Sequence, residues 1–178
     1  MYVREVEKFA NQQRDEIQER NQKIQEGVFE ATADPREPRV APKKEEVPPH
    51  LNFAPLDNAV DALTKTSAEY QKVLEKVSAN GGVLASNSIN EVNEMLMQSE
   101  HKLTTPEGLP GRFWYKHELY APGAYTGYAA KAIPAVRESL EQKKWAEAEQ
   151  AASRVAKVLQ DESALIATAT AKLAAVGK

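Results

Sequence analysis

Apolar residues return at helical spacing in several separate parts of the chain. The clearest run lies near the C-terminus, where an apolar residue recurs every three or four positions and only Glu162 interrupts the pattern. Such spacing lines up one face of a helix for packing. The positions are Trp145, Ala148, Ala152, Val155, Leu159, Ile166, Ala169, Leu173 and Val176. We expect one long helix with a single packed seam.

Three further bundle helices are predicted before it. They are expected at about residues 57–80, 88–103 and 134–140, each with apolar residues on one face. Asp57 is a suitable N-cap for the first, and Ser88 and Glu91 stand in the relation of a capping box for the second. Pro134 is tolerated in the first turn of the third. The predicted fold class is therefore all-α, a four-helix bundle.

The first 28 residues predict an additional amphipathic helix. Glycine and proline are absent from Tyr2 to about Gly27, where a helix stop is plausible. Its apolar stripe is thin and consists of Val3, Val6, Phe9, Ala10, Ile17 and Ile24. We expect this helix to pack on one neighbour and not within a core.

Residues 29–56 predict a linker or a strap that lies over a surface. Six prolines fall between Ala33 and Pro55, and proline removes amide donors and disfavours helix at the preceding residue. The predicted organisation is an N-terminal helix over residues 1–28, a proline-rich strap over 29–56 and a helical domain over 57–178.

The amino-acid composition of the chain limits the kinds of molecule that it is expected to bind. Of 178 residues 42% are apolar, and the formal net charge of -3 gives no general attraction to nucleic acid or to an acidic membrane. No stretch approaches the roughly 20 apolar residues of a membrane span. With no cysteine there is no disulfide or thiolate metal site, and cysteine usage assigns no compartment. An extracytoplasmic parent protein is compatible with this.

One long segment, from Thr104 to Tyr125, lacks the helical pattern. A connection of this length is uncommon in a compact domain unless it has a function or is disordered. Six of the twelve aromatic residues lie in it or just after it, namely Phe113, Trp114, Tyr115, Tyr120, Tyr125 and Tyr128. Because disordered segments are poor in aromatic residues, we expect an ordered loop. It covers the open end of the bundle, contributes to a pocket or partner surface, or does both.

The run LPGRFWYKHELYAP, from Leu109 to Pro122, and the following GAYTGYAAKAIPAV, from Gly123 to Val136, resemble the C-terminal domain of glutamate carboxypeptidases and transferrin receptors. The later KKWAEAEQAASRVAKVL looks like the last bundle helix of that family. The resemblance extends from about Leu56 to the C-terminus. More weakly, the first helix looks like the end of a peptidase domain.

This resemblance implies a homodimerisation domain attached to a peptidase domain that carries zinc and cleaves peptides. It implies that a loop corresponding to residues 120–131 lines the substrate pocket of the parent enzyme. In glutamate carboxypeptidases a lysine and a tyrosine there hold a C-terminal glutamate. The tyrosine corresponds to Tyr128 and the lysine to Gly127, so a preference for terminal glutamate is in doubt, and Lys131 replaces the lysine only if the loop runs differently.

The chain itself shows no catalytic set and no metal site. Its only histidines, His50, His101 and His117, form no close pair, whereas zinc sites favour short ligand spacings. We expect His117 and Tyr120 to be structural residues of the loop. Tyr128 is either a pocket residue or a half-buried aromatic with local hydrogen bonds. The alternatives to a peptidase domain are a receptor-like or scaffold protein of the same fold without activity and a free-standing helical adaptor.

Overall fold

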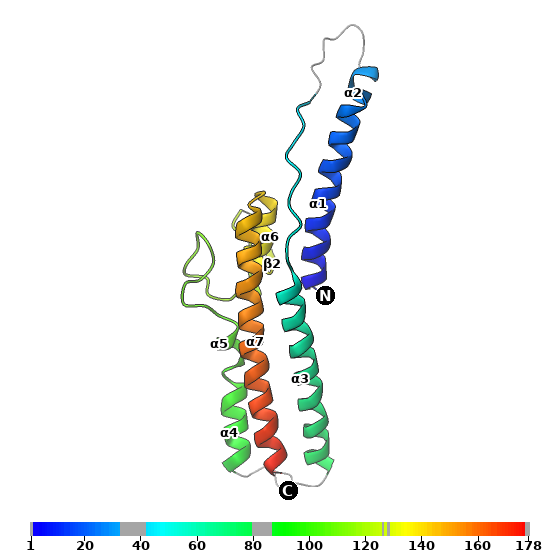
Figure 1. Cartoon of the computed structure of the whole chain (residues 1–178). Coiled ribbons are helices and arrows are strands. Elements are labelled where there is room, and N and C mark those ends of the chain that lie inside the picture. Colours follow the sequence, from blue (N-terminus) through cyan, green and yellow to red (C-terminus); the bar gives the residue numbers. More distant parts are fainter. Residues whose placement is uncertain (1, 33–41, 80–86, 126, 128, 177–178) are drawn as a thin grey trace.

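The computed structural model describes residues 2–32, 42–79, 87–125, 127 and 129–176, and helices dominate it (Figure 1). In chain order the elements are α1 (Tyr2–Gln25), α2 (Val28–Ala31), α3 (Ala54–Ala79), α4 (Asn87–Leu96), α5 (Ser99–Lys102), β1 (Tyr120–Pro122), β2 (Ala130–Ala132), α6 (Pro134–Glu141) and α7 (Trp145–Val176). The predicted helical bundle is confirmed, and one short hairpin is added to it.

Helix α7 is the centre of the bundle and packs against α3, α4 and α6. In Figure 1, α3 and α7 lie side by side and run in the same direction, whereas α4 runs the opposite way. The first half of α7 buries four alanines, Ala148, Ala151, Ala152 and Ala156. Small side chains at a helix contact allow a short interaxial distance, so the alanine-rich sequence of α7 reflects close packing.

Two clusters of buried residues follow one another along α7. The larger cluster includes Leu56, Val136, Leu140 and Val155, all with no exposed surface. The smaller one lies at the other end of the bundle and consists of Val77, Val92, Ala169 and Leu173. Since α7 contributes to both, the regular seam read from its sequence corresponds to a continuous packed face.

The start of α1 belongs to the larger cluster, which differs from the prediction. Val3, Val6 and Ala10 are buried there together with residues of α3 and α7, so this part of the helix does not rest on one neighbour alone. The later stripe residues Ile17 and Ile24 are only half-buried. The reason is geometric, because α1 extends beyond the end of the bundle and only its first turns reach the core (Figure 1).

Residues 42–53 form a strap along α1 without regular secondary structure, whereas the predicted bounds of 29–56 also include helical residues of α2 and α3. Asn21 holds the strap through two bonds to Glu45, since its amide donates to the backbone oxygen at 2.7 Å and its oxygen accepts from the backbone N–H at 2.9 Å. The Glu45 carboxylate joins Arg20 at 2.7 Å and Lys143 at 2.5 Å. The bond from Lys143 lowers the pKa of that carboxyl. Glu45 thereby connects α1 to the corner between α6 and α7.

Helix α3 begins earlier than predicted. It starts at Ala54 and not at Asp57, because the side-chain oxygen of Asn52 accepts a bond from the Ala54 N–H at 3.1 Å. The N–H of Asp57 bonds to the carbonyl of Phe53 at 3.0 Å. Asp57 lies in the first turn, where a carboxylate still complements the helix dipole.

The predicted helix from Ser88 to Leu103 is divided in two. α4 ends at Leu96 and α5 begins at Ser99. Ser88 lies inside the first turn of α4, and the Glu91 carboxylate pairs with Lys172 of α7 at 2.6 Å. The predicted capping box is therefore wrong, because the Glu91 side chain forms an ion pair between α4 and α7. Pro134 opens α6 as predicted, and the left-handed Gly27 (φ 69°) follows the end of α1.

Candidate functional site

The aromatic loop is ordered by hydrogen bonds between its own backbone groups. The N–H of Thr105 donates to Lys116 at 2.9 Å, and the N–H of Leu109 donates to Tyr115 at 2.8 Å. Gly108 has φ +71°, and a Cβ there would lie 2.4 Å from the carbonyl oxygen of Phe113. Only glycine fits this close approach. The loop is thus a folded segment in which the two sides contact each other.

The loop presents some aromatic side chains to the core and others to the surface. Tyr115 packs against the larger core cluster, where Leu109 is buried. In contrast, Phe113 and Trp114 are 69% and 60% exposed, and their rings meet edge to face at 5.3 Å. Tyr125 is 81% exposed. Exposed aromatic residues gathered on one loop are typical of a surface that contacts another domain or a ligand.

A hairpin follows the loop and was not predicted. β1 and β2 pair antiparallel, with Tyr120 opposite Ala132 and Pro122 opposite Ala130. The turn between them is closed by a bond from the Gly123 N–H to the Ala129 carbonyl at 3.2 Å. The hairpin carries residues 120–131, the segment that the family resemblance places at the pocket of a parent enzyme, and the Ala124 N–H at the start of its turn bonds to Glu138 of α6.

Gly127 lies in this turn with φ +66°, and among the described residues beyond its chain neighbours no atom lies within 4 Å of the place where a Cβ would be. The position is therefore open in space but left-handed in backbone conformation. Lys131, the other cation considered for the pocket, pairs with Glu141 at 2.5 Å and is 16% exposed. Its ammonium is thus engaged on α6. Tyr128 lies outside the described residues.

A buried ion pair anchors the start of the turn. Nη2 of Arg112 donates to Glu138 at 2.7 Å, and the two side chains are only 10% and 9% exposed. Nη1 of Arg112 donates to the carbonyl oxygen of Pro122. The other carboxylate oxygen of Glu138 accepts from the Ala124 N–H at 2.8 Å. Arg112 and Glu138 thus hold the two residues that flank Gly123, namely Pro122 and Ala124.

Above this ion pair lies a cleft of about 480 Å³. Trp114 and Tyr125 stand at its edge, and Arg112, Glu138 and Ser139 contribute polar groups. Both carboxylate oxygens of Glu138 accept a bond from the loop or the turn, whereas the buried Nε of Arg112 has no hydrogen-bond partner among the described residues.

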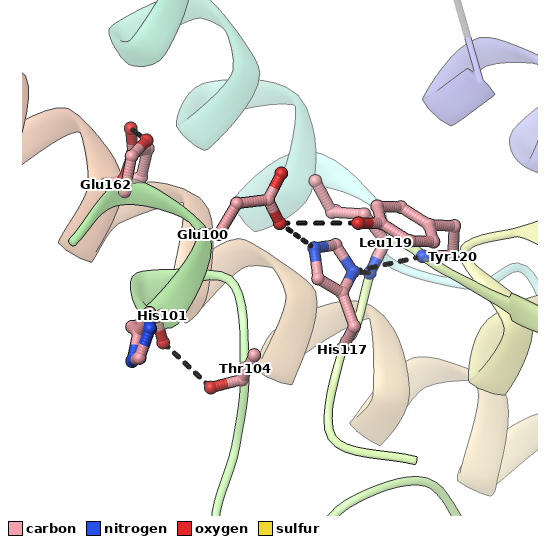
Figure 2. A network of polar contacts seen from close by, with 8 residues as sticks. Glu100, His101, Thr104, His117, Leu119, Tyr120 and Glu162 are labelled. Carbon is pink, nitrogen blue, oxygen red and sulfur yellow. Dashed lines mark hydrogen bonds and ion pairs between the residues drawn. The ribbon is translucent and has the colours of Figure 1, made fainter. Parts of the chain in front are cut away.

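His117 connects the loop to α5, and Figure 2 shows this network. Its Nδ1 accepts from the N–H groups of Leu119 at 3.1 Å and Tyr120 at 3.3 Å. Nε2 lies 3.1 Å from the carboxylate of Glu100, and the hydroxyl of Tyr120 donates to the same carboxylate at 3.4 Å. Since Nδ1 acts as acceptor, Nε2 carries the proton and donates to Glu100. Both sequence-predicted loop residues therefore lie in one hydrogen-bonded group that ties the loop to α5.

Glu118, beside His117, is fully buried between the loop and α7. Its carboxylate accepts from the Thr105 hydroxyl at 2.7 Å and lies 3.8 Å from Nε of Arg154. Residues 104 and 117 also pair as an isolated bridge. Glu118 therefore joins the base of the loop to the central helix.

The described residues contain no group of three or more His, Cys, Asp or Glu side chains able to hold a metal ion. His50 and His101 are exposed in the strap and in α5, and His117 is bound to Glu100. Within the described parts of the chain no helix is long and apolar enough to cross a membrane.

Sequence reasoning missed Arg112 and Glu138. Arg112 lies within the run from Leu109 to Pro122 that carries the family resemblance. Its place in that run was the one feature of the sequence that could have drawn attention to it. Nothing in the sequence indicated that Glu138 is buried. Most residues of α6 are buried, and Glu138 lies between the apolar positions Val136 and Leu140 without interrupting their spacing.

Comparison with known proteins gives matches to one family. The family model of the transferrin receptor-like dimerisation domain matches residues 51–167. The Arabidopsis thaliana protein named "Probable glutamate carboxypeptidase LAMP1" is 37% identical over 71 residues, which cover 40% of this chain and 10% of that protein. The "Probable glutamate carboxypeptidase" of Arthroderma benhamiae is 30% identical over 93 residues, covering 52% of this chain and 12% of that protein. The matches thus span about a tenth of the length of these relatives.

Proposed function

The chain belongs to the transferrin receptor-like dimerisation domain family, and on this premise we propose that it is the homodimerisation domain of a larger peptidase of the glutamate carboxypeptidase type. The family match over residues 51–167 is the observation that carries the proposal. Two relatives are named as glutamate carboxypeptidases, and each is about ten times longer than the segment it shares with this chain.

Peptide hydrolysis would then take place in an attached peptidase domain. Among the described residues no group of three or more His, Cys, Asp or Glu side chains could hold a metal ion. The zinc ion that such chemistry requires would be bound outside this domain, where it would supply an activated water for attack on the peptide carbonyl. The chain alone should be inert towards peptides.

We further propose that the turn of the β1–β2 hairpin lines the substrate pocket of that enzyme. Two observations support this role: Tyr125 in the turn is 81% exposed, and a Cβ at Gly127 would meet no described residue beyond its chain neighbours. Phe113 and Trp114 add exposed aromatic surface next to it. A docked domain would cover this surface and bring the turn to its active site.

Dimer formation is the first prediction. Sedimentation equilibrium of the chain in the micromolar range should give twice the chain mass of 19.7 kDa, because members of a dimerisation domain family are expected to bury a self-complementary patch. The melting temperature should also rise with protein concentration, as mass action requires for a dimer. A monomer at all concentrations, with a constant melting temperature, would contradict the proposal for the isolated domain.

The second prediction concerns Tyr128 in the full-length protein. Tyr128→Phe removes one hydroxyl and keeps the ring, so folding should change little. A lost hydrogen bond is worth about 0.5 to 1.5 kcal/mol, or about 3 kcal/mol if its partner is charged. We expect kcat/KM to fall by about tenfold. An unchanged kcat/KM for every substrate would exclude a pocket role, and a zinc-loaded protein that cleaves no peptide would favour the receptor-like or scaffold alternative.

Gly127→Lys provides the complementary measurement. A lysine at this position should favour substrates that end in glutamate, because its ammonium would pair with the side-chain carboxylate. The left-handed backbone at Gly127 costs a lysine about 1 to 2 kcal/mol. Gly127→Asn is the matched control, since asparagine accepts this conformation and has no charge. The two variants should differ in preference for glutamate, and equal preferences would show that position 127 does not face the substrate.

A further inference from the structure

We infer that Arg112 and Glu138 are positioning residues that fix residues 122–124, where β1 enters the turn, on α6 and so set the shape of the pocket that the turn lines. The inference rests on the proposed function only for its effect on substrates. The positioning itself follows from contacts within this chain.

The two side chains hold the backbone on both sides of Gly123. Arg112 donates to the carbonyl oxygen of Pro122, the last residue of β1. Glu138 accepts from the N–H of Ala124, the first residue after Gly123, at 2.8 Å. Because the ion pair between them closes at 2.7 Å, neither end of this three-residue segment moves without breaking a charged hydrogen bond.

Burial makes these bonds strong. Arg112 and Glu138 are 10% and 9% exposed, so water does not replace a lost partner. A buried charge requires partners for its polar atoms, and hydrogen bonds to a charged group are stronger than those between neutral groups. Both oxygens of Glu138 are used, one for Arg112 and one for Ala124. The guanidinium also lies 5.6 Å from the ring centre of Tyr115, which adds a cation–π contact.

The contacts are directed at the turn and not at the helix bundle. Arg112 comes from the aromatic loop, Glu138 comes from α6, and the backbone groups that they hold belong to β1 and the turn. The bundle core is formed by other α6 residues, such as Val136 and Leu140. Loss of the ion pair should therefore loosen the turn more than it loosens α7.

Glu141 on the same helix offers a matched control. Its carboxylate pairs with Lys131 of β2 at 2.5 Å, but its side chain is 35% exposed. Ion pairs with this degree of solvent access contribute little to stability. The variants Glu138→Gln and Glu141→Gln make the same chemical change on one helix, and only the first removes a buried charge.

Hydrogen–deuterium exchange of the 178-residue chain tests the positioning directly. In Glu138→Gln, peptides covering residues 120–131 should exchange about tenfold faster than in the unchanged chain, because a charged hydrogen bond to the turn is lost. Peptides from α7 should change much less. In Glu141→Gln the turn should stay within about twofold of the original rate.

Arg112→Lys is a second variant for the case that Glu138→Gln destabilises the whole chain. Lysine keeps the positive charge, but its compact ammonium cannot reproduce the two-pronged geometry that reaches both Pro122 and Glu138. We expect faster exchange of the turn here too, with α7 unchanged. The inference is overturned if exchange of residues 120–131 stays at the original rate in both variants, or rises only in step with α7.

Steady-state kinetics of the full-length enzyme then separate the positioning from the proposed function. Glu138→Gln should raise KM by about tenfold, with a smaller change in kcat, because a mobile turn binds substrate less well before the chemical step. Glu141→Gln should leave both constants unchanged. Faster exchange of the turn with an unchanged KM would overturn the pocket role of the hairpin, whereas an unchanged exchange rate would overturn the inference about Arg112 and Glu138.

Discussion

Glu118→Ala is expected to lower the free energy of unfolding by about 3 kcal/mol, the lower end of the range for breaking a buried ion pair. Glu118 has no exposed surface, accepts from the hydroxyl of Thr105 and lies 3.8 Å from Arg154. Its removal leaves the hydroxyl without its acceptor and the guanidinium without the nearby negative charge, and it also creates a cavity. The lower end applies because Arg154 is 36% exposed and reaches water.

Denaturant unfolding of the chain measures this loss of stability. The variant Glu118→Gln separates the contribution of the negative charge from those of side-chain volume and hydrogen bonding. Glutamine keeps the volume and one acceptor, so this variant should lose only about 1 kcal/mol. A double-mutant cycle with Arg154→Met would give the coupling between the two charges. Glu147→Ala, on the exposed face of α7, is the control and should stay within about 0.5 kcal/mol. A loss below about 1 kcal/mol for Glu118→Ala would show that the carboxylate contributes little.

Leu140→Ala should have an effect of similar or larger size. Leu140 is completely buried in the larger core cluster, where α6 meets α7. Replacing such a leucine with alanine costs about 2 to 5 kcal/mol, since apolar contacts are lost and a cavity remains. The midpoint of guanidinium unfolding should fall accordingly, with an unchanged slope.

Met97→Ala is the appropriate comparison for Leu140→Ala. Met97 is 75% exposed beyond the end of α4, so its truncation should change stability by no more than about 0.5 kcal/mol. If the two variants unfolded at the same denaturant concentration, Leu140 would not be part of a well-packed core.

The long helices could be predicted because their apolar positions repeat over many turns. α7 begins at Trp145, as its pattern predicts, and its one interruption has a structural reason. Glu162 is 5% exposed and accepts a bond from the hydroxyl of Ser99 at the start of α5. A buried glutamate inside an apolar seam therefore indicated a polar contact with a neighbouring element, but the periodicity could not identify that element.

The division between α4 and α5 and the start of α3 depend on side-chain bonds that the apolar pattern does not record. Neither glycine nor proline marks the break at Met97, and Asn52 competes with Asp57 as a cap. The hairpin has strands of only three residues, which is too short for an alternating pattern to be recognised. The ladder continues for one pair beyond these strands, where the Ile133 N–H bonds to the Leu119 carbonyl at 2.8 Å.

The segment that carries the candidate site was predicted to be an ordered loop, but the residues that hold it in place were not found. Aromatic residues without helical spacing predicted an ordered loop, and the structure describes one. The pairing of Arg112 with Glu138 joins residues 26 positions apart on a loop and a helix. Spacing along the sequence carries no information about such a contact, because it depends on how the loop returns to α6.

The parallel arrangement of α3 and α7 has a consequence for folding. Contacts between the regions of these helices join distant residues: Asn52 bonds to Glu149 and Thr66 bonds to Ser163, each across 97 positions. Closing a flexible loop of that length costs roughly 4 kcal/mol in chain entropy before any constant term, and contacts of high sequence separation slow folding. No short turn brings the two longest bundle helices together. The chain must therefore complete a long-range encounter before its central helix pair is stabilised, and it should refold more slowly than an up-and-down bundle of equal length.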